Sequence, residues 1–393
     1  MKCLQIRICN FRNIEQAQID FSDGINLFLG NNAQGKTNLL EALFFGTIGK
    51  SFRDSRDKNL IRFGQDFFTL LLSYKEDRED ARTQTIEIRV SEQEKKQIFH
   101  NKVFVKKLSD VVGDFRAVLF CPEHLAMVKD GPQERRTFLD MALSQLFPVY
   151  LESLQKYNRL VKEKNALLRE QKKETMPEDA RDVLGVLNEQ MARECAILTW
   201  YRAWYVRNLD RLVRTVFSEM TEGAECPQVQ YAPGLNEEQK NRVDEILPQG
   251  LFGIDAGERK DCLNQIWKLY LTLLRLSTDR ECIVGTALYG PHKDDMILKI
   301  NEKEARLYAS QGQQRSFALA LKIAEGEISR SYTGEYPLFL FDDVLSELDE
   351  KRKQYLLQKI REKQVIMTSC EKLDMEKNAR IWDVSQGMYK ERT

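Results

Sequence analysis

Residues 24–37 read Gly24-Ile-Asn-Leu-Phe-Leu-Gly30-Asn-Asn-Ala-Gln-Gly35-Lys36-Thr37, and they set the architecture to expect. An apolar run typical of a strand leads into the pattern G-x-x-x-x-G-K-[ST], and a predicted helix follows over Asn38 to Phe45. In such a loop the backbone amides can wrap a phosphate, and the N-terminus of the helix adds partial positive charge. A chance glycine turn is the weaker interpretation. The predicted phosphate-binding loop (P-loop) consists of Gly30, Asn31, Asn32, Ala33, Gln34, Gly35, Lys36 and Thr37.

A second motif lies near the other end of the chain. Leu338-Phe-Leu-Phe-Asp342-Asp343 is a hydrophobic strand that ends in two carboxylates. Such a strand is weak support alone, but together with the P-loop it predicts a triphosphatase site for ATP and Mg²⁺. We expect Lys36 to reach the β- and γ-phosphates, Thr37 and Asp342 to hold Mg²⁺, and Asp343 to polarise the attacking water.

Two further motifs flank this strand. Ser310-Gln-Gly-Gln313-Gln-Arg315 opens a predicted helix, where Ser310 and Gln313 form a second candidate phosphate-recognition surface or an ordinary helix N-cap. Ser346-Glu-Leu-Asp349 follows the acid pair. It is a functional loop or a capping box with Ser346 as N-cap, and both interpretations can hold together.

Composition limits the classes of protein to consider. The 393 residues suggest two or three domains, and the 60 basic and 60 acidic residues cancel, so binding to a polyanion requires a local patch. Eight Cys without a CxxC pair argue against zinc and disulfides. Apolar runs are too short for a membrane span and the N-terminus is no signal peptide, so we expect a cytoplasmic or nucleoid-associated protein.

One cluster of basic residues follows the P-loop helix. It contains Lys50, Arg53, Arg56, Lys58 and Arg62, with Asp54 and Asp57 interspersed. Lys106 and Lys107 are candidates to extend it. Such side chains would contact DNA phosphates rather than bases, which makes binding sensitive to salt. The basic residues on the helix over 150–171 are better explained as a solvated helix face.

Hydrophobic periodicity divides the chain into three parts. Alternating residues such as Ile86, Ile88 and Val90 predict strands in the first hundred residues, with a hairpin over 99–105. A long helical tract over 135–214, broken near Met176-Pro177-Glu178, carries apolar residues at heptad spacing with Lys164 at the skipped position. We expect a short coiled coil or helical hairpin there, an irregular stretch over 222–257, a helix over 261–276, and α/β structure at the end.

The order of these motifs resembles the ABC-type ATPases that carry a large insert. The turn Asn10-Phe11-Arg12-Asn13 is similar to that of the DNA-repair branch, which includes the structural-maintenance-of-chromosomes proteins, and the resemblance implies that Arg12 contacts nucleotide phosphates. Two stretches, Pro122-Glu123 through Arg135-Arg136-Thr-Phe138-Leu139-Asp140 and Gly290-Pro-His-Lys-Asp-Asp295, resemble the RecF family, and the likeness runs over nearly the whole chain. Arg135 and Arg136 fit a structural ion pair or a DNA or dimer contact equally well.

This resemblance implies an α/β fold: an ABC-type ATPase head, with a mixed sheet, flanking helices and an antiparallel lobe, plus an inserted helical lobe with a coiled-coil-like hairpin. We expect the head to comprise 1–112 and 285–393, with the signature helix, Walker B strand and D-loop in the second part. The expected insert is 113–284.

The same resemblance implies a function. Ser310 would face the γ-phosphate bound by Lys36 of a second copy, so ATP would join two protomers. The dimer would bind double-stranded DNA near single-strand junctions and, with RecR and RecO, promote RecA loading, replication restart and SOS induction. The ATPase would be a weak, DNA-stimulated switch. The alternatives are a nucleotide-switched protein adaptor and the ATPase subunit of a nuclease complex.

Three departures from the ABC pattern affect these expectations. Asp343 stands where Glu is usual, which withdraws the carboxylate by about one methylene and predicts slow hydrolysis, because misplacement of ~1 Å can lower a rate about 10²-fold. The usual His is replaced within Met367-Thr-Ser-Cys370, where a hydroxyl is the expected group to reach the γ-phosphate. Asp130 stands where the family pattern has Gly, so the geometry of that loop is open.

Overall fold

The computed structural model describes residues 1–54, 56–78, 80–170, 177–247, 256–371 and 379–392. The chain divides into two compact units: unit 1 contains Met1–Leu125, Val216–Ala224 and Ser310–Thr393, and unit 2 contains Ala126–Thr215 and Glu225–Ala309. These boundaries differ from the expected insert over 113–284. Strand β8 (Ala117–Phe120) pairs with a strand of unit 1 and β10 (Asp295–Ile300) pairs with one of unit 2, so each carries its neighbouring residues into that unit.

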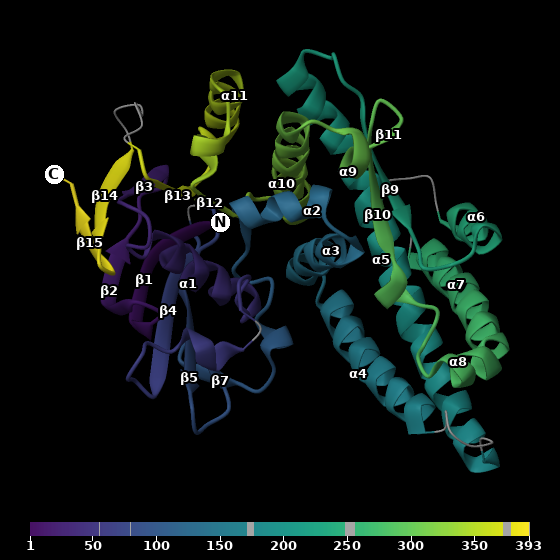
Figure 1. Ribbon diagram of the computed structural model, residues 1–393. Coiled ribbons are helices and arrows are strands. Elements are labelled where there is room, and N and C mark those ends of the chain that lie inside the picture. Colours follow the sequence, from purple (N-terminus) through teal and green to yellow (C-terminus); the bar gives the residue numbers. More distant parts are fainter. Residues whose placement is uncertain (55, 79, 171–176, 248–255, 372–378, 393) are drawn as a thin grey trace. The chain divides into compact units, whose positions relative to one another are not determined.

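An antiparallel sheet of six strands forms one layer of unit 1 (Figure 1). Its order is β2 (Ile14–Asp20), β1 (Lys2–Phe11), β4 (Phe67–Lys75), β5 (Gln84–Ser91), β6 (Gln97–His100) and β7 (Val103–Val105). The alternation predicted for β5 is confirmed, since Ile86, Ile88 and Val90 are all buried. The predicted hairpin is β6 and β7, in which Phe99 lies opposite Phe104.

A mixed sheet forms the second layer of unit 1. Its order is β15 (Met388–Glu391), β14 (Arg380–Ser385), β3 (Ile25–Leu29), β13 (Val365–Ser369), β12 (Leu338–Asp342) and β8. All neighbouring pairs are parallel except β14 with β15. The strands β8, β12 and β13 are buried along their whole length, as expected for a parallel sheet covered on both faces. Their carboxyl ends therefore meet at one edge, where the predicted site residues lie.

Helix α1 (Lys36–Ile48) contacts strands of both sheets, and nearly all its residues are buried. Gly46 permits this approach, because a Cβ there would collide with the side chain of Leu72 on β4. Helix α10 (Gln311–Thr333) approaches the mixed sheet through Gly326, which faces the ring of Phe339. Helix α11 (Glu350–Ile360) and the short helices Asp57–Leu60, Leu108–Asp110, Pro122–Leu125 and Val344–Glu347 complete unit 1.

Unit 2 is mostly helical. Its helices are α2 (Ala126–Lys129), α3 (Pro132–Leu146), α4 (Pro148–Glu170), α6 (Glu237–Ile246), α7 (Ala256–Leu276), α8 (Thr278–Val284), α9 (Ala305–Tyr308) and most of α5 (Glu178–Thr221). A short helix spans Pro291–Lys293, and a small sheet has the order β11 (Lys303–Glu304), β10 and β9 (Pro227–Ala232). The predicted helical tract is confirmed with an additional break at Phe147, and Met176 of the expected break lies outside the described residues.

The prediction of an irregular stretch over 222–257 is wrong for its described part. Strand β9 and helix α6 both lie there, while Pro248 lies outside the described residues. Pro227 is tolerated because β9 is an edge strand, and Asn236 caps α6 by accepting a hydrogen bond from the amide of Gln239.

The expected helical hairpin consists of α4 and α5, which run antiparallel. Lys164 Nζ donates to Asn188 Oδ1 at 2.6 Å, and Arg202 Nε donates to the Tyr150 hydroxyl at 3.0 Å. The two contacts share one antiparallel register, since the residue numbers of each pair sum to 352. Lys164 at the skipped heptad position is fully buried and forms an ion pair with Glu281 at 2.6 Å.

The two family-specific stretches meet inside unit 2. Arg135 forms a bidentate ion pair with Asp295, at 2.7 and 3.0 Å, and Arg202 joins Asp140 and Asp294 at 2.8 Å each. For Arg135 the structural ion pair is therefore confirmed. Arg136 donates to the backbone carbonyl of Asp294 at 2.7 Å.

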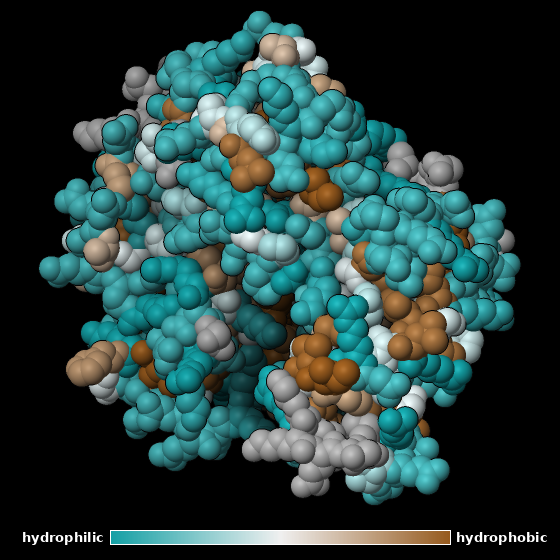
Figure 2. Space-filling view, turned by 45° about the vertical axis from the view of Figure 1, so that its right-hand side comes forward, coloured by the Kyte–Doolittle hydropathy of each residue, from teal (hydrophilic) through white to brown (hydrophobic). Residues whose placement is uncertain are grey.

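The surface facing the viewer in Figure 2 is largely hydrophilic, with hydrophobic residues in separate patches, in keeping with a mean hydropathy of −0.48. Among the described residues, no helix combines the length and apolar character needed to cross a membrane.

Candidate nucleotide-binding site

The P-loop connects the carboxyl end of β3 to α1, as predicted. Gly35 has φ 112°, in the left-handed region that favours glycine. Gly30 lies against β14, where a Cβ would come within 2.4 Å of the Val384 carbonyl oxygen. The loop therefore needs glycine for conformation at Gly35 and for close approach to the backbone of β14 at Gly30.

The β14–β15 turn holds the P-loop from the C-terminal part of the chain. The amide of Gly387 donates to the carbonyl of Gln34 at 2.8 Å, and the Tyr389 hydroxyl donates to the carbonyl of Gly35 at 2.9 Å. The sequence offered no signal for these contacts, because neither residue belongs to a motif.

The side chain of Lys36 lies within the loop. Its ammonium donates to the carbonyls of Gly30 and, at 2.9 Å, Asn31, and lies 3.4 Å from Cys370 Sγ. Lys36 is 6% exposed, so a phosphate held by the loop would meet a cation that is already largely desolvated.

Thr37 and Asp342 are brought together from opposite ends of the chain. The Thr37 hydroxyl donates to Asp342 Oδ2 at 2.7 Å, and the Thr368 hydroxyl donates to Oδ1 at 2.7 Å. Burial raises the pKa of Asp342 above its ordinary value, while the bonds from Thr368 and Thr37 oppose that rise.

Asp343 adopts a left-handed conformation, φ 51°, which Asp tolerates better than most residues. Its amide donates to Thr368 Oγ1 at 3.0 Å, and its Oδ1 is buried with no hydrogen-bond partner in the described part of the chain. With Thr37 and Asp342 it supplies a set of hard oxygen donors, the type that Mg²⁺ prefers. The residues present therefore fit a magnesium ion.

Both hydroxyls of the segment 367–370 have protein partners, and contact of either with the γ-phosphate stays a prediction. The Thr368 hydroxyl donates to Asp342 Oδ1 and accepts from the amide of Asp343, and Ser369 Oγ donates to the Glu371 carbonyl at 2.9 Å. The group beside the P-loop is instead the exposed thiol of Cys370, which donates to Asn32 Oδ1 at 2.8 Å.

Ser310 is the N-cap of α10. Its hydroxyl accepts from the Gln313 amide at 3.2 Å and the Gln313 side chain accepts from the Ser310 amide at 2.7 Å, which is a complete capping box. In the described part of the chain, Ser310 has no hydrogen bond to the P-loop. The capping box expected at Ser346 is wrong, because Asp349 caps α11 and Ser346 donates to the Asp343 carbonyl.

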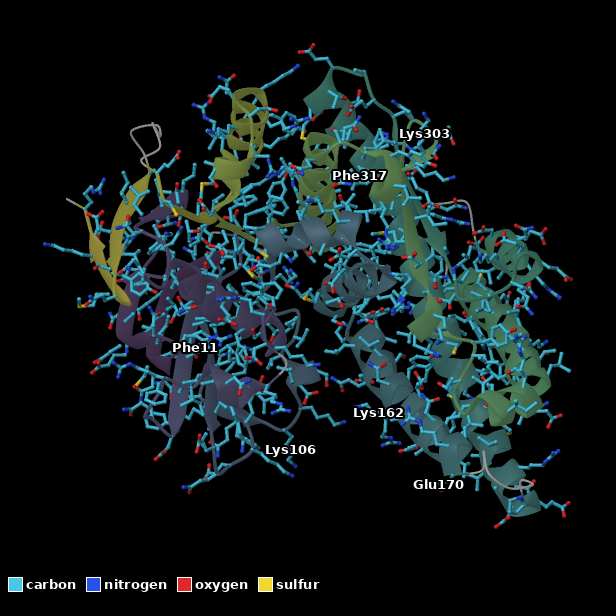
Figure 3. All side chains as sticks on the ribbon, viewed as in Figure 1. Phe11, Lys106, Lys162, Glu170, Lys303 and Phe317 are labelled. Atoms are coloured by element: carbon cyan, nitrogen blue, oxygen red, sulfur yellow. The ribbon has the colours of Figure 1, made fainter. Side chains whose placement is uncertain are left out.

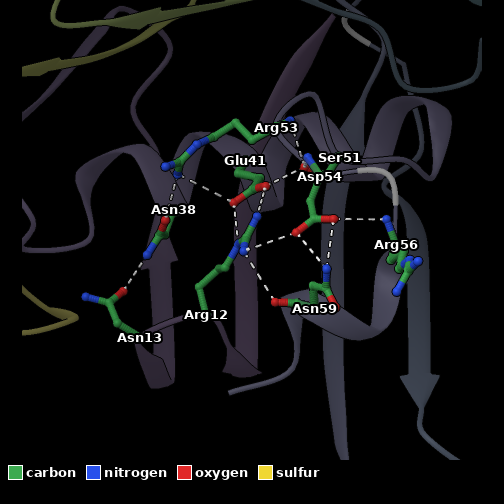
Figure 4. Close-up of polar contacts among 9 residues, drawn as sticks. All are labelled: Arg12, Asn13, Asn38, Glu41, Ser51, Arg53, Asp54, Arg56 and Asn59. Carbon is green, nitrogen blue, oxygen red and sulfur yellow. Dashed lines mark hydrogen bonds and ion pairs between the residues drawn. The ribbon is translucent and has the colours of Figure 1, made fainter. Parts of the chain in front are cut away.

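Arg12 forms an ion pair with a residue of α1 (Figure 4). Its guanidinium donates to both carboxylate oxygens of Glu41, at 2.9 and 2.8 Å, and Glu41 is fully buried on α1. Its neighbour Asn13 accepts from Asn38 Nδ2 at 2.8 Å and lies against Gly35. Contact of Arg12 with a nucleotide stays a prediction.

The candidate DNA-binding residues differ in how they are engaged. Arg53 lies near Glu41 and Asn38, Lys58 donates to the Glu92 carbonyl at 2.6 Å, and Arg62 pairs with Glu15 at 3.0 Å. Lys50 and Arg56 are exposed and have no side-chain hydrogen bond or ion pair among the described residues.

Comparison with known proteins identifies the group to which this chain is related. Residues 3–392 match the model of the RecF/RecN/SMC N-terminal domain. The chain is 37% identical over 394 residues to the DNA replication and repair protein RecF of Macrococcus caseolyticus, covering 98% of this chain and 99% of that protein. The chain belongs to the RecF family.

Other members of the RecF family also match this chain over nearly its whole length. The RecF of Ruminiclostridium cellulolyticum is 39% identical over 363 residues, covering 92% of this chain and 91% of that protein. A solved "recombination mediator protein RecF-ATPrS in RecFOR pathway" matches with a TM-score of 0.86 and 30% identity over 100% of this chain and 98% of that one. An SMC head matches at 15% identity with a TM-score of 0.54 over 100% and 97%, which supports the fold alone. The predicted ABC-type head with a helical insert is thereby confirmed.

Sequence reasoning missed three parts of this RecF-family site. Cys370 was included in the segment that replaces the usual His, but its thiol was given no role there. Glu41 lay unremarked within the P-loop helix, and the turn at Gly387 belongs to no motif. Of these three, only Glu41 could have been noticed in the sequence, because it is a charged residue within the apolar middle of the helix, one turn after Thr37.

Proposed function

We propose that this protein is an ATP-dependent DNA-binding protein of recombinational repair and replication restart, in which ATP joins two copies and slow hydrolysis separates them. The observation that supports this most is the meeting of Thr37, Asp342 and Lys36 at one edge of the mixed sheet, together with a capped helix N-terminus at Ser310.

The residues of the P-loop would bind the phosphates of ATP through backbone amides, the N-terminus of α1 and Lys36. Thr37 and Asp342 would hold Mg²⁺, which when bound neutralises the charge of the β- and γ-phosphates. Asp343 would orient the attacking water, and Arg12 would add a phosphate contact. The short reach of Asp343 supports a slow ATPase that serves as a switch.

The signature residues would act on a second copy. Ser310 and Gln313 lie at the N-terminus of a 23-residue helix, where the amide dipoles favour an anion. Ser310 has no hydrogen bond to the P-loop within its own described chain, which supports completion of the site by the other protomer.

DNA would be contacted by a basic surface on unit 1, which we define as Lys50, Arg53, Arg56, Lys58, Arg62, Lys106 and Lys107. Gly49 supports this grouping, because its missing Cβ would lie 2.8 Å from the side chain of Leu108 and its carbonyl accepts from Lys96 at 2.6 Å. Lys50 therefore lies beside the segment that carries Lys106 and Lys107. Figure 3 places Lys106 at the lower rim of unit 1.

The partners would be double-stranded DNA near gaps and junctions, a second copy of this chain, and RecR, with RecO and RecA acting downstream. The protein would promote RecA loading and SOS induction as a cytoplasmic, nucleoid-associated factor. Its family membership supports this assignment.

The test is the mass in solution with Mg²⁺·ATP, with ADP and without nucleotide. We expect ATP alone to double the mass of the wild type. Ser310→Arg should bind ATP and stay monomeric, whereas Lys36→Arg should fail at binding or at hydrolysis. A mass that never responds to ATP would contradict the clamp and favour a nucleotide-switched adaptor.

A further inference from the structure

Glu41 is a fully buried carboxylate on the P-loop helix, one turn after Thr37. Besides the two bonds from Arg12, it accepts a hydrogen bond from Ser51 Oγ, and Arg53 Nη1 lies 3.9 Å from its Oε2 (Figure 4). A buried carboxylate without a cation is strongly destabilising, so one of these arginines must always compensate it.

The two arginines belong to different segments of unit 1. Arg12 belongs to the turn after β1, next to Asn13, which lies against Gly35 of the P-loop. Arg53 belongs to the basic surface and is 40% exposed, with a second, long bond of 3.3 Å to Asn38 Oδ1. Glu41 thus has one firmly bound arginine and one that is nearly free.

The loop that carries Arg53 is hydrogen-bonded to Glu41 through Ser51. Ser51 Oγ accepts from the amides of Arg53 and Asp54, at 2.9 and 3.0 Å, and Asp54 accepts from Asn59 Nδ2 at 3.1 Å. The amide of Arg12 donates to the carbonyl of Leu60 at 2.7 Å. A movement of Arg12 or of Glu41 is therefore passed to this loop.

We propose that Glu41 is a positioning residue whose carboxylate exchanges counter-ions between Arg12 and Arg53, so that nucleotide and DNA compete for the two arginines within one protomer. This inference rests on the proposed function, in which Arg12 contacts phosphate and Arg53 contacts DNA. When Arg12 leaves Glu41 for a nucleotide phosphate, Arg53 turns inward to compensate the buried charge and is lost to DNA. When DNA takes Arg53, Glu41 keeps Arg12.

The exchange predicts the sign of the coupling between ATP binding and DNA binding. Within a single protomer, ATP weakens DNA binding, and because coupling between two ligands is reciprocal, DNA weakens ATP binding by the same factor. Dimerisation acts in the opposite direction by adding a second DNA-binding surface, so the two effects must be separated.

The experiment uses the full-length chain carrying Ser310→Arg, with its monomeric mass verified in each condition. The affinity for a labelled 30-base-pair duplex is measured by fluorescence anisotropy, without nucleotide and with a saturating non-hydrolysable ATP analogue. We expect the analogue to weaken DNA binding about three- to tenfold, and the duplex to weaken binding of the analogue equally. In this Ser310→Arg background, Glu41→Gln should abolish both effects. Glu41→Asp in place of Glu41→Gln should retain part of them, because it keeps the carboxylate.

Two variants guard against misfolding as an explanation. Arg53→Gln changes an exposed side chain, and it should also remove the coupling. It should weaken binding of the analogue as well, because Glu41 then has no second arginine to compensate it when Arg12 leaves. Glu335→Gln removes another carboxylate of unit 1, which pairs with Arg116 at 2.6 Å, and should keep the coupling. Coupling that survives Glu41→Gln, or that is absent or positive in the monomer, would overturn the exchange. A monomer that does not bind the duplex would also overturn the exchange, which requires both ligands on one protomer, whereas a monomer that does not bind the analogue would overturn the proposed function itself.

Discussion

The charged form of Asp342, which the proposed Mg²⁺ site requires, lowers the stability of the fold. Its carboxylate is 6% exposed, and burial raises its pKa, so the folded chain binds a proton at this group more tightly than the unfolded chain does. The stabilisation that comes from protonation is lost as the pH rises through the folded-state pKa, and at neutral pH the charged form is a cost to folding. The proposed magnesium ligand therefore lowers the stability of the protein when no metal is bound.

We therefore expect Asp342→Asn to raise the melting temperature of the nucleotide-free protein at pH 7.5. The rise should be about 2 °C or more, because ~1 kcal/mol shifts Tm by about 2–4 °C in a domain of this size. The advantage should shrink as the pH falls and vanish near the ordinary Asp value of about 3.9. Thermal unfolding from pH 4 to 8 measures this.

The same variant should lose the further rise in Tm that Mg²⁺·ATP gives the wild type, because its amide is a poor ligand for Mg²⁺. Thr272→Ser, an exposed change in unit 2, is a suitable control and should behave as wild type. A lower Tm for Asp342→Asn at pH 7.5 would show that hydrogen bonding, not desolvation, dominates at this position.

Residues within one continuous motif were predictable, and residues that reach the site from elsewhere were not. The P-loop and the acid pair follow from local sequence because the strand–loop–helix and strand–carboxylate patterns are short. Cys370, Gly387 and Tyr389 reach the same site only through strand order, which brings β13 and β14 to either side of β3. No local pattern encodes that order.

At the scale of elements, the α4–α5 hairpin is organised around a charge. Lys164 lies where the heptad would place an apolar residue, and it contacts Asn188 of α5 and Glu281 of α8. The Lys164–Glu281 ion pair has no exposed side-chain surface on either partner. Such a pair adds little net stability, but it disfavours other registers, since any slip would leave a buried charge alone.

We expect Lys164→Met to destabilise the protein by about 3–5 kcal/mol, because it leaves Glu281 buried without a cation. Adding Glu281→Gln should recover most of that loss, since Gln can still accept from the Leu288 amide. Urea unfolding of the wild type, both single variants and the double variant measures the coupling energy.

A matched control lies on the same helix. Arg159 pairs with Glu163 at 3.3 Å, and both side chains are largely exposed, so Arg159→Ala should change stability by less than about 0.5 kcal/mol. If the double variant is no more stable than Lys164→Met, the pair contributes something other than charge compensation.

Elements with one periodic face were predicted in both the head and the insert. Alternation identified β5, and heptad spacing identified α4, because each has one periodic face. Strand β9 was missed because Pro227 and Pro233 flank it and only Val229 and Tyr231 carry the alternation. Its pairing with β10, almost seventy residues later, is what stabilises it.

At the scale of the whole molecule, charge is balanced overall and uneven locally. With 60 basic and 60 acidic residues, long-range attraction to DNA is weak, so the proposed affinity for DNA would come from the basic surface on unit 1. Lys50, Lys106 and Lys107 are exposed and make no side-chain hydrogen bond or ion pair in the part of the chain that the structure describes, so they are available for phosphate contacts.

We expect Lys50→Gln combined with Lys106→Gln to weaken binding to duplex DNA of any sequence. Each lost phosphate contact should also reduce the slope of log K against log salt by about 0.9. Anisotropy titrations from 50 to 300 mM salt measure this slope. Lys390→Gln, which removes an exposed lysine from β15, should leave it unchanged, and an unaltered slope in the double variant would exclude this surface.

The position of β3 also affects how the protein is made. Its neighbours in the sheet are β13 and β14, and the loop that follows it is held by Gly387 and Tyr389. During translation, residues 25–37 therefore leave the ribosome early and wait for roughly 350 further residues, about 20–70 s at 5–20 residues per second, before their sheet can close. Unit 2 is complete well before then. Nascent chains on the same messenger RNA would thus carry a finished unit 2 before the P-loop is held in place. In the proposed function, ATP would then be unable to join two such chains until β13 to β15 have been made.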